Sequence, residues 1–541
     1  MVYLLEGSRK NIFMIRIFFL LLIIMSQPAC EMLGIQDRYP LLTAAQNGDM
    51  IAATELLSEN AAVNSVSEDQ RFALLEASSN GNLEMVKLFV DNGADVNLLN
   101  KSGMTALMAA ASDGNEDVVS FLIDNGADIA LTNYKGFSAL FFAINKDNKK
   151  SVQLLINHKA PINDSSADGT SPLFLAVKKG YNDVASILIE NGADLNAVNA
   201  NGDTALHMAA VKANHEMLMV LIENGADIHI KNDSKEDGFL VFASAKYGSI
   251  MNNIYERVEK KMNEFSDENS DTGNLLITYN LNDLLKALES VNPEHLTSRQ
   301  MDEIIDLLDN STLSIDISED KFNSVAEQLK EDYLSTAKTF LDNGVDVNET
   351  DRQSQSVIMM ICRQNTRIST IFKDKSIPLR PDTEKKINIA FKVAESIYGE
   401  LIQLYIDAGV DVNLVDQYGQ TVLTSVCGNG NFEYAKLLIE SGAEVNRSNN
   451  DGWTSLIYAV SAENVPISEL LISSGANVNE ANAFGETALL KAVYRNNIPL
   501  VSLLLKSGAN INIENSHGDS PLSVAQKKGY LEILEMFKSY S

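Results

Sequence analysis

A fixed spacing of 33 residues between glycine turns constrains the fold of this 541-residue chain more than any other feature. Most of these turns read Asn-Gly-Ala-Asp in the first block, where one Lys-Ala variant keeps the register. The turn positions are residues 93, 126, 159, 192 and 225, followed in a second block by Gly409, Gly442, Gly475 and Gly508. A spacing kept over so many repeats is typical of a solenoid, in which each repeat packs on its neighbours. Solenoids present long binding surfaces rather than catalytic pockets.

A second mark follows each turn and reads Gly-x-Thr/Ser before a run of small and apolar residues, as in Gly103-Met104-Thr105. The hydroxyl predicts the N-cap of a short first helix, because it can accept an unpaired backbone N–H. A second helix, with apolar residues at helical spacing such as Val118–Ile123, then ends at the Asn-Gly turn. Each repeat is therefore predicted to contain two helices and a polar loop or hairpin.

These marks resemble the ankyrin repeat, and the segment Thr204-Ala205-Leu206-His207-Met208-Ala209-Ala210 is the best match to its signature. The resemblance covers residues 38–248 and 323–541. It implies an all-α solenoid with short β-turn fingers, a stack of about 11 to 12 repeats interrupted by a helical insertion. In that family the fingers and first helices line a concave groove that binds other proteins, and no catalytic or cofactor-binding residues can be carried over.

The repeat register divides the chain into four parts: a signal at 1–30, repeats at 38–248, an insertion at 249–322 and repeats at 323–541. The insertion combines an acidic stretch, predicted to be a loop, with helical patterns. A smaller, basic irregularity lies at 366–387. Such interruptions act as hinges or binding loops, or they reflect drift at tolerant positions. The sequence leaves these alternatives open.

The N-terminus has the pattern of a targeting signal. Arg9, Lys10 and Arg16 precede the apolar run 17–25, which is too short to span a bilayer. Cys30 follows this run and resembles the cysteine of a bacterial lipoprotein box. The box departs from the usual pattern at two positions, Gln27 and Pro28. We expect an exported protein of the cell envelope, periplasmic or surface, with Cys30 lipidated; the alternative is an ordinary cleaved signal and a secreted protein.

Charge and composition restrict the chemistry. The net charge of −30 disfavours nucleic acids and anionic lipid surfaces as partners, since both require basic patches. Cys362 and Cys427 occupy an interior slot of the repeat, and we expect two buried thiols without a disulfide. The six histidines share no metal-ligand spacing, and no nucleophile elbow or phosphate-binding loop is present in the sequence. The sequence therefore predicts no metal, no cofactor and no enzymatic activity.

Candidate binding residues are those that the repeat pattern does not fix. Large apolar side chains stand at finger positions where most repeats carry Asn, Asp, Lys or Gly: Met104, Tyr134, Phe137, Tyr418, Trp453 and Phe484. Aromatic residues and Met near a groove are typical interface anchors, and packing between fingers is the alternative. Trp453 and Phe484 are expected side by side among acidic residues. This arrangement favours a protein partner with an apolar core and a basic rim.

Three functions compete at this stage. The favoured one is a non-enzymatic, exported and lipid-anchored scaffold that binds a protein partner through its fingers and groove. The alternative is a structural or adhesive envelope rod without a dedicated ligand. A third hypothesis assigns an enzymatic or toxic activity to the 249–322 insertion.

Overall fold

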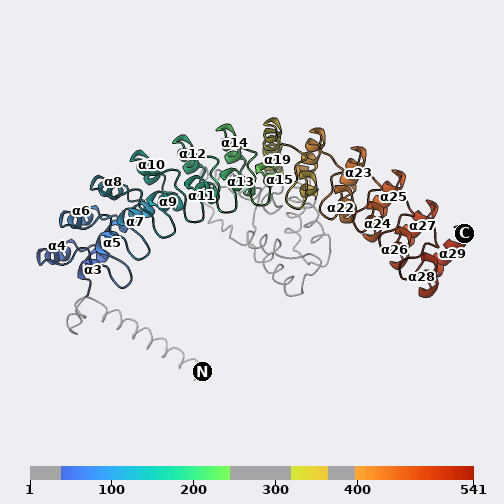
Figure 1. Cartoon of the computed structure of the whole chain (residues 1–541), viewed down its shortest axis with the longest axis horizontal. Coiled ribbons are helices and arrows are strands. Elements are labelled where there is room, and N and C mark those ends of the chain that lie inside the picture. The colour runs from blue at the N-terminus through green and yellow to red at the C-terminus, as the bar shows by residue number, and fades with distance from the viewer. Residues whose placement is uncertain (1–37, 244–318, 363–395, 541) are drawn as a thin grey trace, which may run out of the picture. The chain divides into compact units, whose positions relative to one another are not determined.

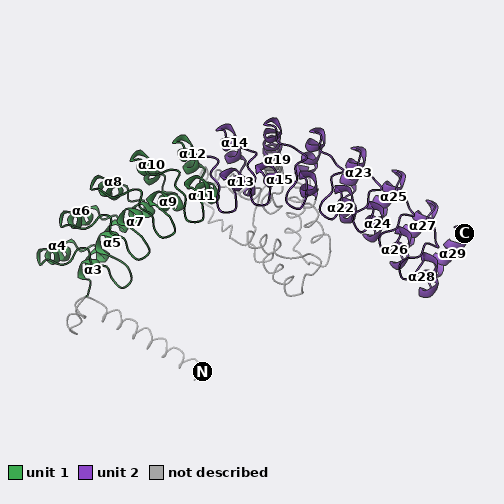
Figure 2. Cartoon of the chain, viewed as in Figure 1, with its two compact units in different colours: residues 1–194 green, residues 195–541 purple. Residues whose placement is uncertain are grey.

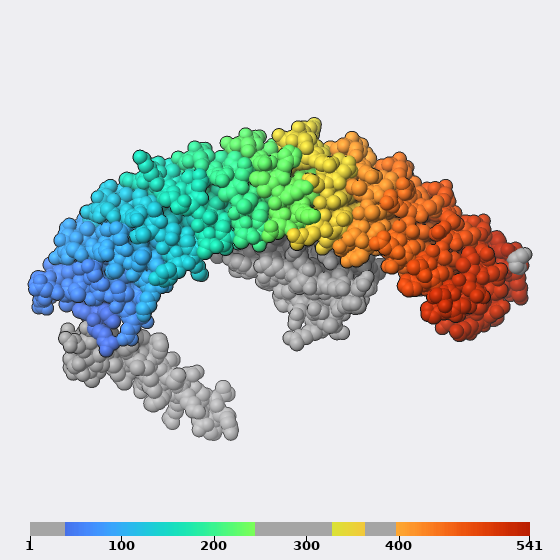
Figure 3. Space-filling model, viewed as in Figure 1, coloured from blue at the N-terminus to red at the C-terminus, as the bar shows by residue number. Residues whose placement is uncertain are grey.

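The computed structural model describes residues 38–243, 319–362 and 396–540. These residues form two compact units, the first ending at Asp194 and the second beginning at Leu195 (Figure 2). The expected signal at 1–30, with Cys30, lies outside the described residues, as does the expected insertion apart from 319–322. Within each unit the helix pairs stack into a continuous packed body (Figure 3).

The first unit repeats one element: a short first helix, a turn, and a slightly longer second helix (Figure 1). The first helices are α3 (Pro40–Asn47), α5 (Ala73–Ser79), α7 (Ala106–Asp113), α9 (Ala139–Asn145) and α11 (Pro172–Lys179). The second helices are α4 (Met50–Ser58), α6 (Leu83–Asp91), α8 (Glu116–Asp124), α10 (Lys149–Asn157) and α12 (Asn182–Glu190). Each first helix packs on the next first helix and on its own second helix, so the two rows enclose a continuous core.

The second unit continues the same alternation. Its first helices are α13 (Ala205–Val211), α15 (Gly238–Ala243), 357–362, α22 (Val422–Asn429), α24 (Ser455–Ser461), α26 (Ala488–Tyr494) and α28 (Pro521–Lys528). Its second helices are α14 (His215–Glu223), α19 (Glu319–Asp342), 396–407, α23 (Phe432–Glu440), α25 (Val465–Ser473), α27 (Ile498–Lys506) and α29 (Leu531–Tyr540). The all-α repeat stack expected from the sequence is confirmed.

The hydroxyl of the Gly-x-Thr/Ser mark caps most of the first helices, as predicted, although Ser138 of α9 makes no such hydrogen bond. Thr105 Oγ1 accepts the backbone N–H of Met108 at 3.1 Å, and Thr454 Oγ1 accepts that of Ile457 at 3.3 Å. Both threonines are buried, so the cap satisfies a donor that water cannot reach. Two residues after the cap, the leucine of the mark is at most 1% exposed in several repeats: Leu107, Leu206, Leu456 and Leu489.

The segment before each first helix forms a finger, which in most repeats is closed by an asparagine. The Asn133 side chain accepts the backbone N–H groups of Lys135 at 2.9 Å and Phe137 at 3.0 Å. The next finger then pairs with this one, since the N–H of Ala167 donates to the Lys135 carbonyl at 2.9 Å. Gly136 adopts a φ of 77°, and a Cβ there would lie 2.8 Å from the nitrogen of Ala167. The finger glycine is therefore required by close contact between repeats.

A second link between repeats, which the sequence analysis did not assign, runs through a row of asparagines. Asn446 donates its side-chain amide to the Gly475 carbonyl at 2.9 Å and accepts the backbone N–H of Asn477 at 2.7 Å. Asn97, Asn413 and Asn479 make the same pair of hydrogen bonds to the turn of the following repeat. Each amide thus fixes the distance between two consecutive turns.

The break in register after residue 243 does not break the stack of the second unit. Helix α19 takes the place of the second helix beside α14, to which it packs directly. His215 on α14 lies 3.0 Å from the Thr336 hydroxyl through Nδ1, and its ring meets Tyr333 edge-on at 4.1 Å. Tyr333 in turn stacks on Phe242 of α15 at 5.6 Å. Helices α15 and α19 therefore act as the two helices of one repeat, with residues 244–318 between them in the chain.

The next repeat has the same organisation. Helix 357–362 is its first helix and helix 396–407 is its second. Phe239 of α15 links both repeats, because its ring packs on Phe340 at 5.7 Å and on Tyr405 at 5.4 Å. Both interruptions of the repeat pattern are thus placed between a first helix and its second helix, in consecutive repeats.

The interior thiols are also as predicted. Cys362 and Cys427 are buried, and neither forms a disulfide. Burial raises the pKa of Cys427 to about 12, so this thiol stays protonated and unreactive at neutral pH. Among the described residues, no helix combines the length and the apolar character needed to cross a bilayer.

Candidate protein-binding surface

In several repeats two positions lie together at the surface: the residue after the finger glycine and the fourth residue of the first helix. We call the surface they form the recognition face. In the first unit it includes Met104, Phe137, Phe142 and Leu175, and in the second unit Gln420, Trp453, Tyr458, Glu486, Lys491 and Asp519. The repeat fixes these positions on helices and hydrogen-bonded turns, so their side chains need little ordering on binding.

In the repeats of α7, α9 and α11 this face is mainly apolar, whereas the repeat of α5 carries the ion pair Arg71–Glu76 at the same two positions. Phe137 stacks on Phe141 at 5.3 Å between ring centroids and meets Phe142 edge-on at 6.3 Å. Phe141 is buried in the core, whereas Phe137 and Phe142 remain half-buried. Leu175, one repeat further, is half-buried at the position that corresponds to Phe142. Partly exposed rings on a rigid base are suited to anchor an apolar side chain of a partner.

In the second unit the same positions carry paired polar and aromatic groups. The Trp453 ring lies against that of Tyr458, 5.1 Å between centroids, and Lys491 Nζ stands 4.9 Å above the Trp453 ring. The Tyr458 hydroxyl is 2.9 Å from Gln420 Nε2 and 3.0 Å from Asn449 Nδ2, which both donate to it. Trp453 is thus held by its own and neighbouring repeats.

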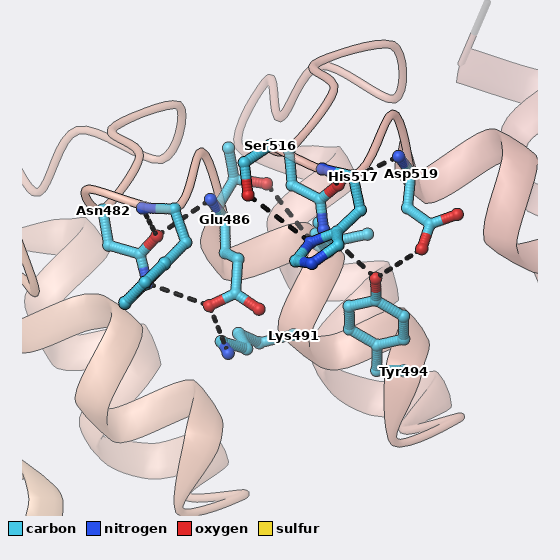
Figure 4. Close-up of polar contacts among 11 residues, drawn as sticks. Asn482, Glu486, Lys491, Tyr494, Ser516, His517 and Asp519 are labelled. Carbon is cyan, nitrogen blue, oxygen red and sulfur yellow. Dashed lines mark hydrogen bonds and ion pairs between the residues drawn. The ribbon is translucent and has the colours of Figure 1, made fainter.

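The network continues through Glu486 to the last repeats (Figure 4). Glu486 is 2.5 Å from Lys491 Nζ and accepts the Asn482 amide at 3.0 Å. Burial acts to raise the pKa of Glu486, but hydrogen bonds from Lys491 and Asn482 outweigh it and leave the pKa lowered. Further along, the Tyr494 hydroxyl donates to Asp519 at 3.0 Å. Burial, and then Asp519, raise the pKa of Tyr494. The acidic groups of this part are already paired within the chain.

The repeats match the family model described as ankyrin repeats in three copies. The matched segments are 16–100, 41–133, 74–166, 140–232, 387–482 and 469–540, which together cover more than half of the chain. The chain belongs to the ankyrin repeat family. Ankyrin repeats are generally protein–protein interaction scaffolds, and the recognition face is built from their fingers and first helices.

Two solved ankyrin repeat structures are similar to parts of this chain. The ankyrin repeat domain of Bcl-3, described as a unique member of the IkappaB protein family, is 27% identical with a TM-score of 0.36; the match covers 38% of this chain and 95% of that one. The human ASB11 ankyrin repeat domain is 27% identical with a TM-score of 0.35, over 37% of this chain and 90% of that one. The chain matches no curated protein sequence.

The six predicted binding residues fall into two groups on the ankyrin stack. Tyr134, Tyr418 and Phe484 are exposed at finger tips, at 76%, 57% and 53%. Met104, Phe137 and Trp453 are half-buried at the finger base.

The structure does not place Trp453 beside Phe484 as a pair of rings. Trp453 follows its finger glycine, whereas Phe484 precedes its own, so the two residues occupy different positions of the repeat. The ring that Trp453 contacts is Tyr458 of its own first helix. Instead of forming an exposed pair with Phe484, Trp453 is half-buried at the finger base and contacts Tyr458 and Lys491.

The part of the recognition face that lies on the first helices was not predicted from the sequence. Phe142, Leu175, Tyr458 and Lys491 were treated as parts of first helices, because their types are common in helices of any kind. The available signal was their position: each is the fourth residue after the Thr or Ser cap. Aligning the ankyrin repeats by their caps places all four in one column, two residues beyond the buried leucine of the mark.

A further polar cluster lies at the joint beside the first interruption. Asp237 replaces the Thr or Ser cap of other ankyrin repeats, is 1% exposed, and accepts the N–H of Leu240 at 2.8 Å. Burial, and then the neighbouring Glu349 carboxylate of the next finger, raise the pKa of Asp237 to about 6. Glu349 itself is paired with Lys231. Among the described residues, no group of three or more acidic, His or Cys side chains is arranged to hold a metal ion.

Proposed function

We propose that this ankyrin repeat protein is a non-enzymatic scaffold that binds a protein partner through the recognition face. The observation that carries the proposal is the row of half-buried apolar side chains on this face of the first unit, above all Phe137 and Phe142. Rings of this kind are costly to leave in water and are typical hot spots when a partner covers them. The general role of ankyrin repeats as interaction scaffolds supports the same conclusion.

We also propose that the protein is exported and anchored in the cell envelope through a lipid on Cys30. The support is the sequence alone: basic residues, a short apolar run and a cysteine directly behind it. Labelling cells with a fatty-acid analogue tests this proposal. Label incorporated by the natural protein and lost in Cys30→Ser is the expected result, and label retained in Cys30→Ser would contradict it.

The interaction test compares two variants of the first unit for capture of partners from envelope extract. Phe142→Ser removes a ring from the recognition face, and Ile51→Ser removes an apolar side chain, 74% exposed, from second helix α4. We expect the natural protein and Ile51→Ser to retain one dominant partner, and Phe142→Ser to lose at least about 2 kcal/mol of binding. Thermal melting of both variants separates lost binding from lost folding.

A structural or adhesive envelope rod without a dedicated ligand remains the second candidate. It predicts weak capture of many proteins, with equal yields from the natural protein and Phe142→Ser. One dominant partner that depends on Phe142 would exclude the rod as the main function.

A further inference from the structure

The recognition face of the first unit is flanked by lysines. Its apolar strip, Met104, Phe137, Phe142 and Leu175, lies between two sets of exposed basic side chains that we call the flanking lysines. Lys101 and Lys135 stand on the fingers that carry Met104 and Phe137, and Lys146, Lys178 and Lys179 stand at the ends of first helices. The net charge of the chain is −30, so a local group of this sign contrasts with its surroundings.

Helix geometry places the second set beside the strip. Lys146 follows Phe142 by four residues, directly after α9, and Lys179 follows Leu175 by four residues within α11. Residues four apart lie on the same face of a helix, one turn apart. Helices α9 and α11 pack on each other, so their lysines form one basic edge along the strip.

The flanking lysines are also unpaired. None of the five forms an ion pair with another described residue, whereas Lys149 and Lys150 on the adjacent second helix pair with Asp183 and Glu116. In the second unit, the lysine of the recognition face is paired: Lys491 is bound to Glu486. The flanking lysines of the first unit differ from it in this respect.

Three carboxylates lie near the flanking lysines: Asp113 at the end of α7, Asp147 next to Lys146, and Asp168 on the following finger. The Ser166 hydroxyl donates to Asp168 and, as the main cause, lowers its pKa. These three negative charges do not cancel five lysines. The face therefore combines apolar anchors with a net positive rim.

We propose, building on the protein-binding function above, that this face of the first unit binds an acidic amphipathic segment of a protein partner. Its apolar side chains contact Phe137, Phe142 and Leu175, and its carboxylates contact the flanking lysines. Opposite charges around an apolar centre select the partner and increase the association rate. An amphipathic helix that lays its apolar side into a groove is a common solution for such a surface. This occupant differs from the partner with a basic rim that the sequence predicted around Trp453 and Phe484.

The test uses the full chain and three short labelled peptides of equal length, followed by fluorescence anisotropy. The first carries leucines on one helical face and glutamates elsewhere, the second replaces the glutamates with lysines, and the third replaces the leucines with serines. We expect the first peptide to bind at least about tenfold more tightly than the other two. Its affinity should fall as salt screens the lysines.

Matched variants assign the binding to this face. Lys146→Glu/Lys179→Glu should weaken the acidic peptide at least about tenfold and improve binding of the basic one. The control Lys87→Glu/Lys159→Glu makes the same change in net charge on α6 and after α10, and should leave the affinity unchanged. Lys146, Lys159 and Lys179 are exposed, so their replacement should leave the melting curves unchanged. Lys87 is half-buried and pairs with Glu84, so the control variant should melt slightly earlier without losing the peptide.

Several outcomes would overturn this inference: equal binding of acidic and basic peptides, no binding of either, or insensitivity to Lys146→Glu/Lys179→Glu. A single-stranded oligonucleotide that displaces the acidic peptide would point to a general polyanion site and overturn it too. Binding of the basic peptide that is lost in Phe142→Ser would refute the acidic partner but support the proposed function. That function fails only if a displayed peptide library also yields no ligand dependent on Phe142.

Discussion

Replacing Asp237 by threonine should stabilise the second unit at neutral pH. Asp237 is a buried N-cap, and Thr454 shows that a threonine hydroxyl fills the same position in another repeat. The variant Asp237→Thr therefore keeps a cap for the N–H of Leu240 while it removes a carboxyl that faces Glu349. The cation at this site, Lys231, is bound to Glu349 rather than to Asp237. Removing the Asp237 charge should therefore break no ion pair with Lys231.

The magnitude follows from the pKa. Burial and then Glu349 raise the pKa of Asp237 from its usual 3.8 to about 6. The folded chain therefore holds this proton more tightly than the unfolded chain. The resulting stability is complete below the unfolded pKa and is lost as the pH rises through the folded one. At neutral pH, this shift makes the natural protein about 3 kcal/mol less stable than it would be with Asp237 protonated. Asp237→Thr should restore this free energy of unfolding.

Hydrogen exchange measures this difference locally. The opening free energy of peptides that cover α15 should be higher in Asp237→Thr than in the natural protein at neutral pH, and the gain should disappear toward about pH 4. Nearby carboxyls that share the site are Glu236, Asp203 and Asp351, and they are the same in both proteins. A gain that does not change with pH, or a loss at neutral pH, would refute the reasoning. Asp49→Thr, at the exposed N-cap of α4, is the control and should show no such gain.

The remaining predictions concern the repeat interior and its links. Leu456→Ala should cost about 2–5 kcal/mol, and exchange should accelerate first in adjacent repeats; uniform acceleration along the chain would contradict nearest-neighbour packing. Asn446→Ala removes two inter-repeat hydrogen bonds and should cost about 1–2 kcal/mol in chemical unfolding, and an unchanged midpoint would show that these bonds add nothing. Trp453→Ala should lower the melting temperature whereas Phe484→Ala should not, because only Trp453 packs on Tyr458 and Lys491. Burial lowers the pKa of His207, so its contribution to stability is present above the ordinary histidine pKa and should fall on acidification; His207→Gln should flatten that pH profile.

The repeat pattern allowed the helices and their caps to be predicted, because each repeat must cap the start of its first helix and end its second helix in the same way. A hydroxyl such as that of Thr105 or Thr454 caps most first helices, and a glycine such as Gly136 is required where neighbouring fingers touch. Local spacing therefore determined the architecture. The same logic placed Leu456 in the core and the thiol of Cys427 in its interior.

The joint between α15 and α19 could not be derived in this way. Its contacts join residues 121 positions apart, His215 and Thr336, through an aromatic group that no regular repeat contains. Nothing in the spacing shows that Phe242 and Tyr333 meet across residues 244–318. Pairings over such separations depend on which surfaces happen to be complementary, and a single sequence does not reveal that.

The binding residues were predicted in part, for a related reason. Finger residues such as Tyr134 and Phe484 stand out because they break a pattern, and the structure shows both exposed. Phe142 and Leu175 break no pattern, since apolar residues are expected in helices. An alignment of the repeats by their caps places both in one column, and the structure shows that this column is half-buried at the surface, with Phe142 in contact with Phe137.

Site-specific photo-crosslinking in living cells tests most directly whether partners are bound by the recognition face. A photoreactive phenylalanine analogue is placed at Phe142, on the face, or at Asn157, exposed at the end of second helix α10. Recognition through this face predicts one dominant protein adduct at Phe142 that is absent at Asn157. Equal adducts at both positions, or a dominant adduct at Asn157 alone, would contradict it.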